Sequence, residues 1–385
     1  MLNRITPHGK KMKAISAGAW LALTLALVWL VGCNPEKPLV PDGQGRIEIT
    51  VLDSVGYTTN TRPSHPVPVQ DAQVYLTSQQ YLWHRSGSTD QAGKYIADGL
   101  PVSHYHLNVS YSLNPAYQLI CTREIAFESN QTYRDSLYLA PQPLPPLLIN
   151  EVYYCGPPGA NGLFFDQFIE LVNPGDTTVY LDGKIIGRCA AFDEVVASIE
   201  QVDYVTAVYA FRFPGEPGGR TLPVPPGSVV VLAGDAMNFQ LINPNSVNLE
   251  YADFEFYNQF GQDMDNPAVP NLENMIYEGN NDFLFNRKSD ALFIADGDQW
   301  KKVEMVFSFG SVFFLQIPLR SIIDAVEYKA SSGTPKILTR RLDAGYAGVG
   351  ITSFSGKSIQ RRGLQDFNDS SVDFQILNHP TPFVP

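Results

Sequence analysis

Two histidines separated by one residue, His104 and His106, have the spacing of a metal-ligand pair. They stand in a stretch of alternating character, where side chains two residues apart project from one face of a strand. Two imidazoles on one face can share a transition-metal ion. The sequence favours the alternative, a pair of solvated surface histidines, because no acidic residue is adjacent to either one.

A second candidate metal site is the run from Gln262 to Asn266, in which Asp263 and Asp265 supply alternating oxygen ligands suited to Ca²⁺. The run lacks the glycine and the terminal glutamate of an EF-hand loop. We therefore expect no cofactor, and Ca²⁺ or another metal remains the alternative.

Three acids at strand ends and turns, Glu151, Glu170 and Asp182, raise the question of general acid–base catalysis. In such positions carboxylates commonly accept backbone N–H groups, so we expect structural roles for all three. The chain also lacks the linear signatures of serine hydrolases, zinc proteases and nucleotide-binding loops. We expect no catalytic residue, while a hydrolase of glycan or peptide stays an alternative because a glycosidase needs only two carboxylates placed by the fold.

The stretch from Asp235 to Asp282 combines nine acids with seven aromatics and contains no Lys, Arg or His. Exposed aromatics beside acids can bind cations, sugars or a basic partner, whereas inward-pointing aromatics only fix a loop to the core. We expect most of them to point inward. The candidates for a binding surface are Tyr251, Phe254, Phe256, Tyr257 and Phe260.

An apolar segment near the start of the chain carries the cysteine with the clearest chemistry. Ala14 to Gly32 holds 19 uncharged residues, follows several basic residues and ends directly before Cys33. This arrangement resembles the lipobox of bacterial lipoproteins, which implies cleavage before Cys33 and lipidation of its thiol. The alternative is an uncleaved transmembrane helix, which the polar, proline-containing residues after Cys33 disfavour.

The remaining cysteines are Cys121, Cys155 and Cys189, and three cannot all pair. A Cys155–Cys189 disulfide is one interpretation, since an exported protein meets an oxidising compartment. The interpretation that the sequence favours is three buried thiols.

Charge limits the classes of partner. The formal net charge is −12, and removal of residues 1–32 takes away four basic residues and no acid, which leaves −16. A polyanion is repelled by such a field, so we expect no nucleic-acid partner. The 29 prolines and 30 glycines, with short runs of Val, Ile, Tyr and Phe, predict an all-β chain of strands and turns.

The first predicted domain covers residues 46–140, after a signal peptide at 1–32 and a lipidated tether at 33–45. Arg46 to Leu52 alternates as a half-buried strand does, and Asp90 and Gly93 bracket a tight turn. The motif T-D-x-x-G-x-Y that contains this turn, with the later G-L-P, resembles the carboxypeptidase-regulatory-like, prealbumin-type β-sandwiches. That resemblance implies an accessory role without catalysis.

A proline-rich linker at 141–146 predicts the boundary to a second domain, residues 147–385. Its motifs I-N-E-V, F-I-E-L-x-N-P-G and V-x-L-D-G, with a later D-x-V-x-Y strand and a T-P turn, resemble the lamin-tail domain, an immunoglobulin-like sandwich. A long insertion, about residues 188–286, interrupts the match, although Ser228 to Ala233 within it is strand-like and predicts a strand of the sandwich.

Taken together, these features are similar to lipoproteins with a domain of unknown function from Bacteroidota-type envelopes. The resemblance implies an outer-membrane lipoprotein held by its lipid, and relatives of that kind often accompany outer-membrane transporters. The single acid Glu36 close to Cys33 resembles the acidic tether of surface-exported lipoproteins and favours surface display. We therefore expect a non-catalytic binding or accessory protein for a glycan or other nutrient. The alternatives are the hydrolase and a structural spacer or adhesion protein.

Overall fold

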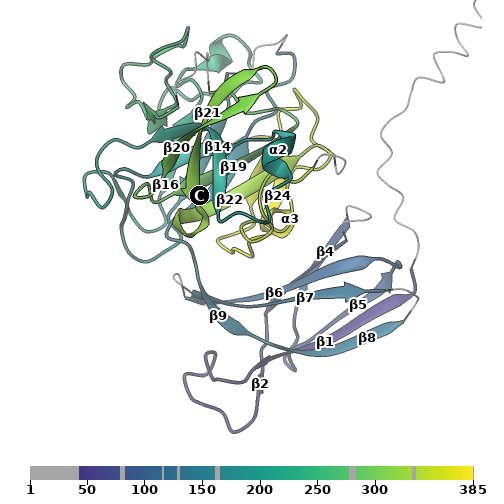
Figure 1. Cartoon of the computed structure of the whole chain (residues 1–385). Helices are drawn as coiled ribbons and strands as arrows, with labels where there is room; N and C mark the ends of the chain where they lie inside the picture. Colours follow the sequence, from purple (N-terminus) through teal and green to yellow (C-terminus); the bar gives the residue numbers. More distant parts are fainter. Residues whose placement is uncertain are drawn as a thin grey trace, which may run out of the picture. The chain divides into compact units, whose positions relative to one another are not determined.

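The computed structural model describes residues 43–78, 83–114, 117–127, 131–160, 165–276, 283–331 and 335–384. The predicted signal peptide, the lipidation site Cys33 and nearly all of the tether lie outside these residues. No helix in the described part has the length and apolar character needed to span a membrane. The described chain is nearly all β, as the composition predicted, and forms several sheets (Figure 1).

The first sandwich contains two sheets. In one sheet β1 pairs with β2 and β5 antiparallel and with β8 in parallel. The strands of this sheet are β1 (Gly45–Asp53), β2 (Val67–Pro68), β5 (Lys94–Leu100) and β8 (Thr132–Tyr138). The other has the order β4-β3-β6-β7-β9, with β3 (Gln73–Ser78), β4 (Trp83–Ser88), β6 (His104–Asn114), β7 (Tyr117–Ala126) and β9 (Ala140–Pro143).

Alternation places the core of this sandwich. Ile47, Ile49 and Val51 of β1 are buried while the residues between them are half-exposed. In β6 the same period buries Tyr105 and Leu107. The half-buried strand expected at Arg46 to Leu52 is therefore present.

The proline-rich stretch differs from the expected linker. Its first residues form β9, which pairs with β7 at the edge of the five-stranded sheet. An edge strand tolerates Pro141 and Pro143 because the missing N–H groups can face away from the ladder. Composition alone could not distinguish this edge strand from a free polyproline connector.

The second sandwich contains two large sheets. One has the order β17-β16-β11-β10-β23-β24, with β10 (Leu148–Tyr153), β11 (Phe168–Val172), β16 (Val229–Ala233), β17 (Phe254–Glu255), β23 (Ser358–Arg361) and β24 (Phe374–Leu377). The other has the order β20-β21-β14-β13-β19-β22, with β18 beside β14; its strands are β13 (Ile185–Cys189), β14 (Tyr204–Arg212), β18 (Glu273–Asn274), β19 (Ser289–Ala295), β20 (Lys301–Phe307), β21 (Gly310–Pro318) and β22 (Ile322–Lys329).

The smaller elements connect these sheets. They are a two-stranded ribbon of β12 (Val179–Tyr180) and β15 (Pro223–Val224), two single-turn helices α2 (Asp193–Val196) and α3 (Ser370–Asp373), and the 3-10 turns Phe239–Leu241 and Leu319–Ser321.

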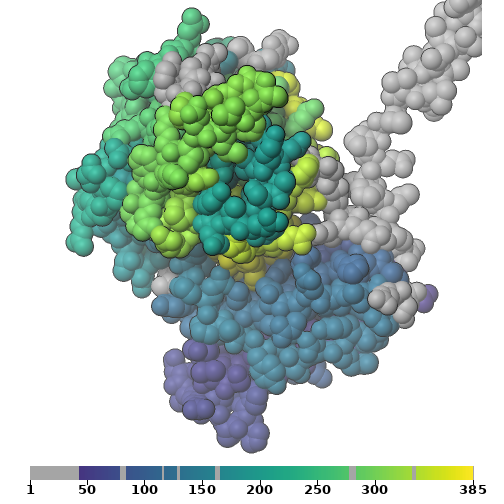
Figure 2. Space-filling view, in the orientation of Figure 1, coloured from purple at the N-terminus to yellow at the C-terminus, as the bar shows by residue number. Residues whose placement is uncertain are grey.

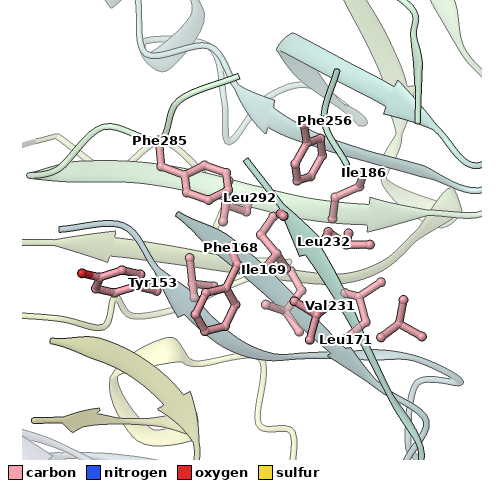
Figure 3. Packing of buried hydrophobic residues seen from close by; sticks show 14 of the residues in the cluster. Tyr153, Phe168, Ile169, Leu171, Ile186, Val231, Leu232, Phe256, Phe285 and Leu292 are labelled. Carbon is pink, nitrogen blue, oxygen red and sulfur yellow. The ribbon is translucent and has the colours of Figure 1, made fainter. Parts of the chain in front are cut away.

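The core of the second sandwich lies between its two large sheets. β10 and β11 are buried at every position, which marks them as central strands covered on both faces. Phe168, Ile169 and Leu171 of β11 pack with Ile186 of β13 and Leu292 of β19 in one apolar cluster (Figure 3). The same strands carry Glu151 and Glu170 into the interior.

Part of the predicted insertion belongs to the sandwich itself. β16 pairs with β11, which confirms the strand expected at Ser228 to Ala233. β14 pairs with both β13 and β21 and is an inner strand that the sequence motifs did not reveal. After Ala233 the predicted insertion contributes only the short strands β17 and β18 to the two large sheets.

Candidate functional site

A cleft of about 500 Å³ opens in the second sandwich. Four segments line it: the loop after β10, the chain that follows β16, the loop before β23, and the tail after β24. Its described lining contains amide, hydroxyl, imidazole, proline and aromatic groups and no Asp, Glu, Lys or Arg. The lining residues are Pro158, Gln240, Pro244, Asn245, Ser246, Val247, Asn248, Ser355, Gly356, His379, Pro380, Pro382 and Phe383.

Two buried glutamates hold the tail that forms one wall. The backbone N–H of Thr381 donates to Glu151 Oε1 at 3.0 Å, and the Thr381 hydroxyl donates to Oε2 at 2.9 Å. The backbone N–H of Phe383 donates to Glu170 Oε2 at 2.7 Å. Since His379, Pro380, Pro382 and Phe383 line the cleft, this clasp of Glu151 and Glu170 positions them.

The two glutamates are cross-strand partners in β10 and β11, beside an irregularity in the register. Ser358 of β23 donates to Glu151 Oε1 at 2.5 Å, and Asn150 donates to Glu170 Oε1 at 2.7 Å. Burial raises the pKa of Glu170 to about 7 and also raises the pKa of Glu151. The proximity of the two carboxyls adds to the rise at Glu170. The clasp is therefore sensitive to pH near neutrality.

A third buried acid, Asp166, holds the opposite wall. The backbone N–H of Val247 donates to its Oδ2 at 3.1 Å, and the Ser246 side chain also donates to it. Burial raises the pKa of Asp166 to about 6. The side chains of Asn243 and Asn245 both donate to the carbonyl of Pro158, at 3.0 and 3.3 Å, and join two lining segments.

These contacts confirm the structural interpretation of the acids. Asp182 likewise accepts the N–H groups of Thr221 and Leu222. The chemistry that the cleft offers is uncharged hydrogen bonding beside apolar ring surfaces, with carboxylates fixing the walls from behind.

The predicted histidine pair lies in β6. His104 is exposed, and His106 is half-buried with its Nδ1 3.9 Å from Glu124 Oε1. Among the residues that the structure describes, no three His, Cys, Asp or Glu side chains gather as metal ligands would. The pair thus points outward, as the alternation predicted, and gains no third ligand in the described ranges.

The predicted Ca²⁺ ligands serve loop turns. Asp263 accepts the backbone N–H groups of Asn258 and Met264 at 2.6 and 2.8 Å. Asp265 accepts the side-chain amide of Asn271 at 2.9 Å. The two carboxylates hold different parts of the loop and do not converge with a third acid in the described chain.

Two of the five predicted binding aromatics are wrong. Phe254 and Phe256 are 7% and 0% exposed and belong to the core, where Phe256 lies 4.2 Å from Phe283 between ring centroids. β17 adds to the sheet beside β16, which turns both rings inward. Tyr251 and Phe260 are exposed and Tyr257 is half-buried, so these three remain on the surface.

The predicted Cys155–Cys189 disulfide is also wrong, because Cys121, Cys155 and Cys189 are all free and buried. Cys155 Sγ accepts the backbone N–H of Lys357 at 3.2 Å, next to the cleft loop. Cys189 packs in a different apolar cluster with β14 and β19 residues. The two thiols belong to separate environments, and the favoured interpretation of buried thiols is confirmed.

The cleft residues themselves were missed. Asn245, Ser246 and His379 carry no motif, because a cleft built from four segments has no fixed spacing along the chain. One signal was available: a glutamate inside the apolar run L-L-I-N-E-V-Y-Y must be buried, and a buried carboxylate needs donors.

Comparison with known proteins locates this chain among β proteins. Residues 225–381 match a family described as "Protein of unknown function (DUF4876)". The crystal structure of a DUF4876 family protein from Bacteroides thetaiotaomicron VPI-5482 is similar to the chain, with 20% sequence identity and a TM-score of 0.53 over 86% of this chain and 94% of that one. That likeness supports the fold.

Two weaker likenesses have TM-scores too low to bear on the fold. A candidate carbohydrate-binding protein from Pseudomonas aeruginosa has 13% identity and a TM-score of 0.19, over 25% of this chain and 89% of that chain. A shaft pilin from Lactobacillus rhamnosus GG has 7% identity and a TM-score of 0.20, over 67% of this chain and 90% of that chain. No curated protein matches the sequence.

Proposed function

We propose that the chain is a non-catalytic binding lipoprotein that captures an uncharged, hydroxyl-rich ligand in the cleft of its second sandwich. The observation that carries the proposal is the lining of the cleft, which supplies amide, hydroxyl and imidazole groups without a charged side chain in its described part. A volume of about 500 Å³ suits a small molecule or a few sugar units.

The ligand class follows from this lining. Gln240 offers an amide donor and acceptor, and Asn245 offers its amide oxygen beside the N–H that it donates to Pro158, while the amide of Asn248 bonds Glu250. A sugar hydroxyl requires both a donor and an acceptor. Pro158 and the half-exposed ring of Phe383 offer apolar surface for the faces of a sugar ring. A charged ligand would have to leave water without a counter-charge, which is costly. An oligosaccharide is therefore the favoured ligand.

The acids near the cleft support binding over hydrolysis. Glycoside hydrolysis needs one carboxyl as acid and a second as base or nucleophile, both facing the scissile bond. Glu151, Glu170 and Asp166 instead accept backbone N–H groups of the segments that line the cleft. Both oxygens of Glu151 and of Glu170, and Oδ2 of Asp166, accept donors of the fold, and each of these residues is at most 1% exposed.

The proposal extends to the two modules and the anchor. The first sandwich acts as a prealbumin-like spacer, and the second is a lamin-tail-type domain whose E, E and T-P motif residues form the clasp. Lipid on Cys33 holds the chain in the outer membrane, facing the cell surface, where a transporter receives the captured nutrient. Protease treatment of intact cells tests the orientation, because a protected chain contradicts surface display.

The decisive test is ligand binding by the full chain, extracted from its host envelope in mild detergent. An oligosaccharide array finds the ligand, and calorimetry compares the unaltered chain with Asn245→Ala and His379→Ala. Each substitution removes a side chain that can hydrogen-bond to a hydroxyl of the sugar, and we expect it to weaken binding about tenfold. Gln262→Ala, an exposed amide outside the cleft, serves as the control.

Three outcomes decide between the hypotheses. Cleft-dependent binding without turnover supports the proposal. Release of reducing sugar that depends on Glu151 or Glu170 replaces it with the hydrolase. Absence of binding to every glycan, with a transporter still co-purifying, leaves the spacer as the better account.

A further inference from the structure

The hairpin of β20 and β21 carries the largest apolar exposure of the seven-stranded sheet. β20 is the last strand of that sheet, so its outer edge has no neighbouring strand in the described part of the chain. Val306 is 80% exposed, Phe309 is 68% exposed and Trp300 is 45% exposed. The hairpin atoms, bright green in Figure 2, form part of the visible surface. Edge strands of this kind are association sites unless something covers them.

The hairpin geometry fixes which backbone groups face outward. Phe307 pairs with Gly310 across a two-residue loop, and the register continues to Lys301 opposite Gln316. In such a hairpin the residues that flank the loop are hydrogen-bonded to each other, and every second residue repeats the pattern. The N–H and C=O groups of Lys302, Glu304 and Val306 therefore point to the open edge.

The side chains at this edge are complementary to their own copy. If two β20 edges pair antiparallel with Val303 opposite Val303, each Lys302 faces the Glu304 of the other copy and each Trp300 faces the other Val306. Lys302 and Glu304 have no ion-pair partner within the described residues. This register gives two cross-strand ion pairs and covers two exposed apolar pairs at once.

Neighbouring registers are disfavoured by charge. A shift by two residues in one direction sets Glu304 against Glu304, and in the other direction Lys302 against Lys302. Like charges directly opposite each other destabilise a strand pair. After a shift by one residue, the outward-pointing N–H and C=O groups of one strand would lie opposite residues whose own N–H and C=O groups point away, toward β21. One register satisfies charge, apolar cover and backbone together.

We propose that β20 is a homodimer interface, in which two copies join their seven-stranded sheets edge to edge with Val303 at the two-fold axis. Antiparallel pairing about a two-fold is isologous and closed, so it stops at a dimer. The partner is a second copy of this chain. The inference does not depend on the ligand of the cleft.

Disulfide trapping tests the register in the full chain. Val303 lies at a non-hydrogen-bonded position of the dimer, where the Cα atoms of facing residues approach to about 4.5 Å, close enough for a disulfide. We expect Val303→Cys to give a covalent dimer under mild oxidation, with the unaltered chain as background. Glu304→Cys is the matched variant and crosslinks better only if the glutamates face each other. Failure of Val303→Cys to crosslink while the chain is folded overturns the proposal.

A charge swap tests the same interface without cysteines. Glu304→Lys places four lysines together and should weaken dimerisation about tenfold in sedimentation equilibrium. The double variant Lys302→Glu with Glu304→Lys restores the pairing and should regain the dimer. If Phe309→Ser abolishes flotation with lipid vesicles while neither charge variant changes the mass, the hairpin tip contacts a membrane and the dimer is wrong.

Discussion

Buried carboxylates hold the segments that line the cleft. Glu151 and Glu170 are fully buried in adjacent strands, yet each accepts backbone N–H groups from the tail of the chain. Burial raises the pKa of both, because the charged form loses its hydration. The hydrogen bonds from the tail offset part of this desolvation free energy. They also connect the two strands to the wall of the cleft.

The titration of Glu170 predicts a pH dependence of stability. Its pKa of about 7 in the folded chain lies above the value of about 4.3 for an unfolded glutamate. The folded state therefore binds the proton more tightly between these values. The contribution of Glu170 protonation to the free energy of unfolding is fully present below about pH 4 and is lost as the pH rises through about 7. Glu170→Gln should remove this part of the slope, about 2 kcal/mol between pH 5 and pH 8.

Urea unfolding at the two pH values measures the effect. Glu216→Gln, at an exposed turn, is the control and should keep the unaltered slope. An equal slope in the Glu170→Gln chain would show that the carboxyl is not the source of the pH dependence.

Removal of Glu151 tests the clasp more severely. Glu151→Ala leaves the Ser358 hydroxyl and the Thr381 N–H without their acceptor, at a cost of about 1–3 kcal/mol. Hydrogen exchange should rise at residues 379–384 and stay unchanged in β1. Uniform acceleration across both sandwiches would instead indicate general destabilisation.

The sequence predicted where strands occur along the chain better than it predicted which sheet each strand joins. Alternation with period two predicted β1, whereas short apolar runs bounded by turn residues predicted β10, β11 and β16, whose burial is nearly continuous. β14 was not predicted because it lies inside the predicted insertion. β9 was not predicted because its prolines are typical of a linker. The cleft could not be predicted at all, since its four segments meet only in the folded sandwich.

A turn that the sequence did predict gives a matched pair of variants. Gly183 has φ +70°, and a Cβ there would lie 2.3 Å from the nitrogen of Pro217. Gly218 has φ +83° with nothing within 4 Å of its Cβ position. Gly183→Ala should cost clearly more stability than Gly218→Ala, whose backbone strain alone costs about 1 kcal/mol. Equal melting temperatures for the two variants would contradict the close packing of this turn.

The whole molecule is a pair of β-sandwiches without a disulfide among its described cysteines. Its stability therefore comes from the apolar clusters and should not change when a reductant is added. Thiol titration in denaturant should find three groups per chain, from Cys121, Cys155 and Cys189, if lipid occupies the sulfur of Cys33 as proposed. A fourth reactive thiol would contradict lipidation, and fewer than three would contradict the free cysteines.

Hydrogen exchange of the full chain, measured with and without the oligosaccharide that the array selects, shows whether the cleft is the proposed binding site. We expect slower exchange at residues 240–248 and 379–383, which contain the cleft lining, with little change at Tyr251 and Phe260. Protection confined to the surface around Tyr251 and Phe260, or to the first sandwich, would contradict the cleft as the binding site.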